Sequence, residues 1–81
     1  MRVTVLLFAR PRDVVGASRL EVDLPDGATA GDAFEALVRR APGLADMKSR
    51  IRCAVEGEYS NWQAPLRDGS ELALIPPTAG G

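Results

Sequence analysis

The sequence predicts a small α+β domain in which one main helix packs on one face of a mixed sheet of four to five strands. Short runs that alternate apolar and polar residues, as strands do, lie on both sides of a single segment with helical periodicity. At 81 residues the chain is too short for two independent cores, so these segments must share one. With 46% hydrophobic and 26% charged residues, the composition is that of a globular protein that folds unaided.

Two strands are predicted in the first 24 residues. Residues 1–9 alternate at first and then become continuously apolar, which is typical of a strand inside a sheet. Residues 10–16 have Pro11 near their start and Gly16 at their end, which indicates a short helical turn or loop. Leu20, Val22 and Leu24 then alternate with acidic residues, so a second strand can pair with the first as a hairpin with a long connection.

The main helix is predicted to begin after Thr29. Thr29 is a suitable N-cap, and Asp32 stands three residues later, where an acidic side chain completes a capping box. The residues at 41–43, Ala-Pro-Gly, end the helix. Between these limits an apolar stripe lies on one helix face and consists of Ala33, Phe34, Leu37 and Val38.

Two further strands are predicted before a distinct C-terminal segment. Residues 50–56 alternate, with Ile51, Cys53 and Val55 on one face, and a turn at Gly57-Glu58 follows. Residues 61–66 are expected to be irregular, and residues 71–75 form the last strand. The order strand, strand, helix, strand, strand is that of a β-grasp, or ubiquitin-like, fold. We therefore divide the chain into a β-grasp domain, residues 1–75, and a flexible projecting tail, residues 76–81.

Charge and segment length exclude several classes of function. The formal net charge is −1 and no basic run is longer than Arg39-Arg40, which argues against a nucleic acid as the main ligand. No window approaches the roughly 20 apolar residues that span a bilayer, and the N-terminus lacks the length and cleavage site of a signal peptide. The single Cys53 cannot form an internal disulfide. We expect a cytoplasmic protein without a membrane partner.

Side-chain chemistry excludes most forms of catalysis. The chain has no histidine, which removes the commonest general base, the commonest metal ligand and the usual nucleophile pairs. Cys53 alone cannot build a zinc site, and its alternation with Ile51 and Val55 places it on a buried face, where packing is the better interpretation. The acidic residues lie at outward strand positions or in turns, as solvated side chains do. No metal site, bound cofactor or phosphate-binding glycine motif is expected.

The C-terminal residues Pro-Pro-Thr-Ala-Gly-Gly are the segment that carries a chemical hypothesis. Pro76 and Pro77 make a stiff arm, and Gly80 and Gly81 form a tip without side chains that can enter a narrow channel. If a partner adenylates the terminal carboxylate with ATP, a sulfide or persulfide can displace AMP and leave a thiocarboxylate. A frayed terminus also often contains glycine, but the full Pro-Pro to Gly-Gly ending favours the functional interpretation.

Several motifs together resemble a known family over essentially the whole chain. They are Leu7-Phe8-Ala9, the segment from Arg12 to Gly16, Ala54-Val55, Pro65-Leu66, Asp68-Gly69 and the C-terminal segment from Pro76 to Gly81. With them the chain resembles the small subunit of molybdopterin synthase (MoaD type), one of the ubiquitin-like sulfur carriers.

The resemblance implies a route for sulfur. An E1-like adenylyltransferase (MoeB type) would use ATP to activate Gly81, and a sulfurtransferase would supply the sulfur. The thiocarboxylate would then enter the large subunit (MoaE type), with Gly80 threaded through its channel, and donate sulfur to cyclic pyranopterin monophosphate. The chain would be a sulfur-donating subunit of a heterotetramer, with the acid-base residues on the large subunit.

The resemblance also implies partner-binding residues. Phe8, Arg12, Ile75, Pro76 and Pro77 match the segments beside the tail that the family uses to contact both the activating enzyme and the large subunit. Ile75 replaces an aromatic residue that is common at this position and keeps an apolar contact. From the residues alone, Phe8 and Ile75 fit a core role equally well.

Four further residues bear on which partner the chain binds: two aromatic residues are possible contacts, and two residues depart from the family pattern. Tyr59 and Trp62 match a stretch in which the family presents apolar residues to its partner, and local packing explains them equally well. Pro11 lies inside the first short helix, and Glu56 stands where the family often has Asn before a turn. An added charge at the rim of an interface can change which partner is accepted.

Three alternatives remain open from the sequence. The chain could carry sulfur for thiamine thiazole synthesis or another thiolation route. It could be a ubiquitin-like modifier whose Gly81 forms an isopeptide bond with a lysine. It could also be a non-covalent β-grasp binding module with an inert tail. In addition, an exposed final strand could pair with a strand of a partner or of a second copy.

Overall fold

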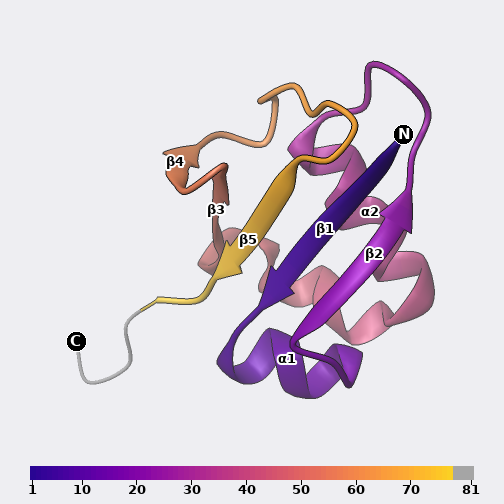
Figure 1. Ribbon diagram of the computed structural model, residues 1–81. Coiled ribbons are helices and arrows are strands. Elements are labelled where there is room, and N and C mark those ends of the chain that lie inside the picture. The colour runs from indigo at the N-terminus through magenta and orange to yellow at the C-terminus, as the bar shows by residue number, and fades with distance from the viewer. Residues whose placement is uncertain (78–81) are drawn as a thin grey trace.

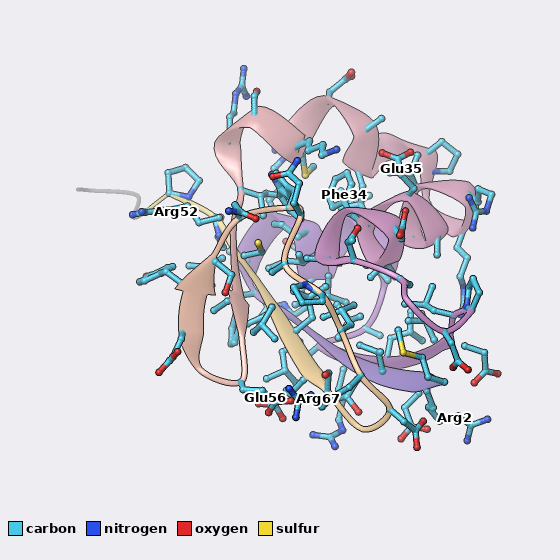
Figure 2. All side chains as sticks on the ribbon, turned by 90° about the horizontal axis from the view of Figure 1, so that it is seen from above. Arg2, Phe34, Glu35, Arg52, Glu56 and Arg67 are labelled. Carbon is cyan, nitrogen blue, oxygen red and sulfur yellow. The ribbon has the colours of Figure 1, made fainter. Side chains whose placement is uncertain are left out.

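Five strands form one mixed sheet, and the helices lie on one side of it (Figure 1). The computed structural model describes residues 1–77. In chain order the elements are β1 (Arg2–Leu7), α1 (Ala9–Val15), β2 (Arg19–Asp23), α2 (Ala30–Arg40), the 3₁₀ helix η1 (Pro42–Arg50), β3 (Arg52–Val55), β4 (Glu58–Ser60) and β5 (Glu71–Ile75). Figure 2 shows α2 and η1 in one layer and the sheet in the other. The predicted α+β class and the β-grasp order of elements are confirmed.

The strand order is β2-β1-β5-β3-β4, which places the last strand in the centre of the sheet. β1 pairs antiparallel with β2 and parallel with β5, while β3 pairs antiparallel with both β5 and β4. The predicted hairpin of the first two strands is therefore confirmed. The expectation of an exposed final strand is wrong, because both edges of β5 are hydrogen bonded. None of the side chains of β5 is fully exposed, which is typical of a central strand.

The capping box of α2 forms as predicted. The backbone N–H of Asp32 donates to Thr29 Oγ1 at 3.2 Å, and the backbone N–H of Thr29 donates to Asp32 Oδ2 at 2.9 Å. These two bonds satisfy N–H groups that the first turn of a helix leaves without partners. The helix buries Ala30, Ala33, Phe34 and Leu37 against the sheet and ends at Arg40.

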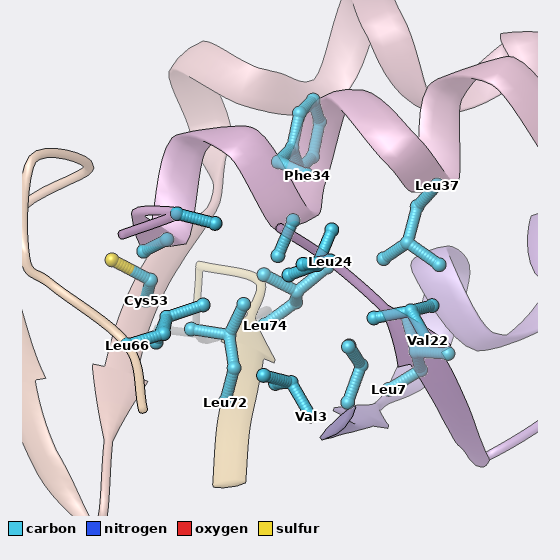
Figure 3. Close-up of a cluster of buried hydrophobic side chains, with 14 of the residues drawn as sticks. Val3, Leu7, Val22, Leu24, Phe34, Leu37, Cys53, Leu66, Leu72 and Leu74 are labelled. Carbon is cyan, nitrogen blue, oxygen red and sulfur yellow. The ribbon is translucent and has the colours of Figure 1, made fainter. Parts of the chain in front are cut away.

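The core lies between α2 and the inner face of the sheet (Figure 3). Alternate residues of the central strands point into it, among them Val3, Val5 and Leu7 of β1 and Leu72 and Leu74 of β5. Cys53 is also in this core and is 2% exposed. Its Sγ donates to the backbone carbonyl oxygen of Ser60 at 3.2 Å, and burial raises the pKa of the thiol. The predicted packing role of Cys53 is confirmed.

The sequence prediction missed η1 and β4 and misplaced the turn between β3 and β4. The turn residues are Glu56 and Gly57, and Glu58 already belongs to β4. Both turn residues have positive φ, 52° and 83°, as a two-residue hairpin turn requires. Glu56 is not glycine, but its backbone N–H donates to Glu71 O at 2.9 Å and its Oε1 accepts from the Glu71 N–H at 3.0 Å. These bonds to β5 stabilise an unusual backbone conformation.

Candidate functional site

The C-terminal segment leaves the sheet at the edge where β1 and β5 both end. Because these strands are parallel, Leu7 lies opposite Leu74, and Phe8 and Ile75 come next on the two strands. Pro76 is half-buried and Pro77 is exposed. Gly80 and Gly81, the predicted reactive end, lie outside the described residues. We call this side of the molecule the tail edge; α1 follows β1 there (Figure 1).

An apolar strip crosses the sheet face that has no helix on it. Leu6 lies opposite Ala73, Ala73 opposite Ala54, and Ala54 opposite Tyr59, so the four residues form one row across four strands. The row lies on the face away from the core, since the residues that alternate with it along β1, β5 and β3 are core residues, namely Val5, Leu7, Leu72, Leu74 and Cys53. Ala54 is covered by its neighbours and is 5% exposed. Phe8 and Ile75 continue the row at the tail edge. We call this set the open-face strip, defined as Leu6, Phe8, Ala54, Tyr59, Ala73 and Ile75.

Two members of the open-face strip expose large apolar surfaces. Phe8 is 46% exposed and Tyr59 is 63% exposed. The core role considered for Phe8 therefore does not apply, whereas Ile75 is half-buried. Aromatic side chains exposed beside other apolar residues are typical of surfaces that bind another protein.

Arg52 is a site residue that the sequence reasoning missed. It lies opposite Ile75 on β3, and its guanidinium carbon is 4.7 Å from the centroid of the Tyr59 ring. This cation–π contact restrains the exposed ring. Figure 2 shows Arg52 next to the end of β5. Only the pairing of β3 with β4 and β5 brings the three residues together, so no local signal in the sequence could have identified Arg52.

Arg12 lies on α1, and its side chain is exposed at the tail edge. Its Nε is 3.5 Å from Asp13 Oδ1, an exposed ion pair that contributes little to stability. Pro11 is fully buried beside it. Since Pro11 lies in the first turn of α1, its missing N–H leaves no hydrogen bond unmade. The helix accommodates this departure from the family pattern and still presents Arg12 to solvent.

Trp62 lies apart from the other predicted contact residues. Its ring centroid is 5.2 Å from that of Phe34 on α2, and its carbonyl oxygen accepts from the Gly31 N–H at 2.8 Å. Trp62 is thus on the helix side of the sheet and packs locally. The structure brings Phe8, Tyr59 and Ile75 together on the open face, with Arg12, Pro76 and Pro77 along the adjoining tail edge. A partner contact by Trp62 stays a prediction.

The described residues contain no cluster of metal-ligating side chains and no buried acidic side chain. Within residues 1–77, no three His, Cys, Asp or Glu side chains lie close enough together to hold a metal ion. None of the carboxylate residues is buried. None of the helices in the described part of the chain combines the length and apolarity that a bilayer crossing requires.

The five-stranded mixed sheet with its main helix on one face is the β-grasp, or ubiquitin-like, fold. The model of the ThiS family matches residues 5–81, and the chain belongs to that family. It is 36% identical to the molybdopterin synthase sulfur carrier subunit of Arabidopsis thaliana, over all of this chain and 84% of that protein. It is 35% identical to small archaeal modifier protein 1 of Haloferax volcanii, over 93% of this chain and 95% of that one. The resemblance inferred from the sequence motifs is confirmed.

Solved structures agree with this assignment. The crystal structure of SAMP1 from Haloferax volcanii superposes with a TM-score of 0.87 at 34% identity and covers all of both chains. A chain from the complex of subunits 1 and 2 of the molybdopterin-converting factor of Helicobacter pylori superposes with a TM-score of 0.70, over all of both chains. At 22% identity, the second comparison concerns the fold alone.

Proposed function

We propose that this chain is the sulfur carrier of molybdenum cofactor biosynthesis and the small subunit of a molybdopterin synthase. The observation that carries the proposal is the full-length similarity to proteins named as that subunit. The Gly80-Gly81 terminus, which follows two prolines at the end of a central strand, supports it. The absence of histidine supports a donor role, in which the pterin pocket and the acid-base residues belong to the large subunit.

The proposed chemistry takes place at the Gly81 carboxylate. A carboxylate oxygen attacks the α-phosphorus of ATP on an E1-like adenylyltransferase, and pyrophosphate leaves. Sulfide then attacks the carbonyl carbon; the bond to AMP breaks and AMP leaves. If the attacking group is instead the persulfide of a sulfurtransferase, AMP leaves in the same way and a thiol then reduces the S–S bond of the acyl disulfide, which releases the sulfurtransferase. The product is a thiocarboxylate; in the large subunit its sulfur bonds to cyclic pyranopterin monophosphate, and water cleaves the bond between that sulfur and the Gly81 carbonyl carbon, which restores the carboxylate. The chain binds no cofactor itself in this scheme, and the ATP belongs to the activating enzyme.

The open-face strip is the surface that we assign to partner binding. It combines exposed aromatic area with a polar residue, Arg52, at its border, as protein interfaces commonly do. Phe8 and Ile75 extend the strip to the tail edge, so a partner bound there also reaches the C-terminus. We propose that the large subunit binds this face and that two copies of each subunit form a heterotetramer.

Intact mass after activation tests this function. The chain is incubated with ATP, sulfide and the E1-like adenylyltransferase of its own source. We expect a gain of about 16 Da, the difference between sulfur and oxygen in a carboxylate turned into a thiocarboxylate. Adding the large subunit and cyclic pyranopterin monophosphate should reverse the gain. No gain with an adenylyltransferase active on another carrier would contradict the proposal, and a gain reversed only by a thiazole precursor would assign the chain to thiamine synthesis.

A second candidate function is protein modification, which the similarity to small archaeal modifier protein 1 favours. In that case a lysine amine attacks the adenylated Gly81, an amide bond forms and AMP leaves. Lys48 is the only lysine of the chain. The N-terminal amine is poorly available, because it donates to Leu24 O at 2.7 Å and the Met1 side chain is 4% exposed.

If the chain modifies copies of itself, we expect every linkage to be at Lys48. The Nζ atom of Lys48 is 3.8 Å from Glu35 Oε2 and 5.5 Å from the Trp62 ring centroid. A Lys48→Arg variant keeps the charge and these contacts but has no acylable amine. It should lose all self-conjugates when adenylation is run without sulfide, as read by gel and intact mass. Conjugates of undiminished yield in this variant would place the acceptor elsewhere.

A further inference from the structure

Charges that are scattered along the sequence separate into two edges of the folded molecule. The tail edge carries five exposed arginines: Arg10, Arg12, Arg19, Arg50 and Arg52. Strand pairing places Arg19 opposite Leu6 at the end of β1 and Arg52 opposite Ile75 at the end of β5. Arg10 and Arg12 belong to α1, and Arg10 and Arg50 line one groove together with Pro76 and Pro77. Within residues 1–77, Arg12 is the only one of the five with a carboxylate within 4.0 Å.

The opposite edge is acidic. Its carboxylates are Asp23, Asp26, Glu56, Glu58, Asp68 and Glu71, placed there by the start of β1, the turn after β3 and the start of β5. Two arginines, Arg2 and Arg67, lie among them, and Figure 2 shows both well away from Arg52. The Arg2 guanidinium is 3.1 Å from Asp23 Oδ1 and lowers the pKa of that carboxyl. A chain of net charge −1 thus has a strongly basic tail edge.

A groove with a volume of about 280 Å³ lies at the same edge. Its apolar lining consists of Ala9, Pro11, Met47, Ile51, Pro76 and Pro77, and Arg10 and Arg50 complete its wall. Sites for small molecules are usually about 300 to 1,000 Å³. This groove is slightly below that range, and its size suits one large apolar side chain; Arg10 and Arg50 are the charged residues of its lining.

We propose that this groove receives an apolar side chain, flanked by carboxylates, from the surface of the adenylyltransferase that activates Gly81. The inference rests on the proposed function. Gly81 is four residues beyond Pro77, and four extended residues span at most about 14 Å. An enzyme that acts on Gly81 therefore comes within a short distance of the groove. Among residues 1–77, Arg10 and Arg50 have no carboxylate within 4.0 Å, and carboxylates on the enzyme surface would compensate their charges best.

Two charge reversals with the same net charge test the proposal. Arg50→Glu changes the groove, whereas Arg67→Glu changes the acidic edge; each lowers the formal net charge by two, from −1 to −3. With the adenylyltransferase of the same source at low salt, we expect Arg50→Glu to slow association about tenfold and Arg67→Glu less than about twofold. At about 0.5 M salt the difference should nearly vanish, because the Debye length is then only a few Å. Stopped-flow fluorescence measures these rates, and equal urea midpoints exclude a folding defect.

A third variant addresses the apolar lining. Met47→Gln keeps the charge of the groove but makes its lining polar, so it should raise the dissociation rate about tenfold and leave the association rate unchanged. Equal association rates for Arg50→Glu and Arg67→Glu would overturn the inference, as would absence of binding by the unaltered chain. Binding with the expected charge dependence but no thiocarboxylate would contradict the proposed function and leave the inference standing.

Discussion

Deletion of Gly81 is expected to lower the rate of thiocarboxylate formation by more than about 100-fold. The new C-terminal carboxylate, on Gly80, would stand one residue, about 3.5 Å, short of the position that Gly81 reaches in the adenylyltransferase. Displacement of a reacting group by even 1 Å costs about 100-fold, because the reacting atoms no longer approach within attack distance. The mass gain of about 16 Da, followed over time, measures the rate.

Thr78→Ala is the matched control for this deletion, since it changes the C-terminal segment without changing its length. It should retain a rate within a few-fold of the unaltered chain. The deletion should also leave the urea midpoint unchanged, because Leu74 is the last buried apolar residue within residues 1–77. That result would support the predicted division into a domain of residues 1–75 and a tail of residues 76–81. Undiminished thiocarboxylate formation without Gly81 would contradict the role given to this residue.

The second large effect is expected at Tyr59. Tyr59→Ala should weaken binding to the large subunit about 10- to 100-fold, equivalent to about 1.4 to 2.7 kcal/mol. The ring is 63% exposed in the open-face strip and is restrained by Arg52, so it can be buried by a partner at little entropic cost. Stability should fall by less than about 1 kcal/mol, as for other exposed positions. Isothermal titration calorimetry measures the affinity and urea unfolding the stability.

Trp62→Ala is the comparison for Tyr59→Ala, because partner contact and local packing explain both residues equally well at the level of the sequence. Trp62 packs on Phe34, so its removal should lower the free energy of unfolding by about 2 to 4 kcal/mol. Affinity for the large subunit, measured on the folded protein, should change less than about twofold. Strong loss of affinity in Trp62→Ala with no loss in Tyr59→Ala would move the partner contact to the helix side of the sheet.

Much of the fold was predictable because its signals are local. The capping box at Thr29 and Asp32 and the apolar stripe of α2 depend on residues a few positions apart, and both were found where predicted. η1 and β4 were missed for an equally physical reason. η1 has one buried residue, Leu44, and therefore lacks the repeating pattern of apolar residues by which a helix is recognised in a sequence. β4 has three residues and owes its existence to pairing with β3.

The sequence indicated most of the residues of the candidate site, but it did not indicate how these residues are arranged in space. The motifs next to the tail indicated Phe8, Arg12 and Ile75, and these residues do lie along one edge. Tyr59 and Trp62 are only three positions apart in the chain, yet they lie on opposite sides of the sheet. Their separation depends on the pairing of Tyr59 with Ala54 and on the contact of Trp62 with Phe34.

The sequence by itself determined the class of fold, the family and the chemistry of the C-terminal residues, because these depend on local periodicity, short motifs and residue type. The tertiary structure decided which distant segments are neighbours. It placed β5 between β1 and β3, set Arg52 against Tyr59, and closed a groove between Arg10 and Arg50. It also gathered charges that are scattered along the chain into a basic and an acidic edge, since parallel and antiparallel strands pair residues that are 13 to 67 positions apart.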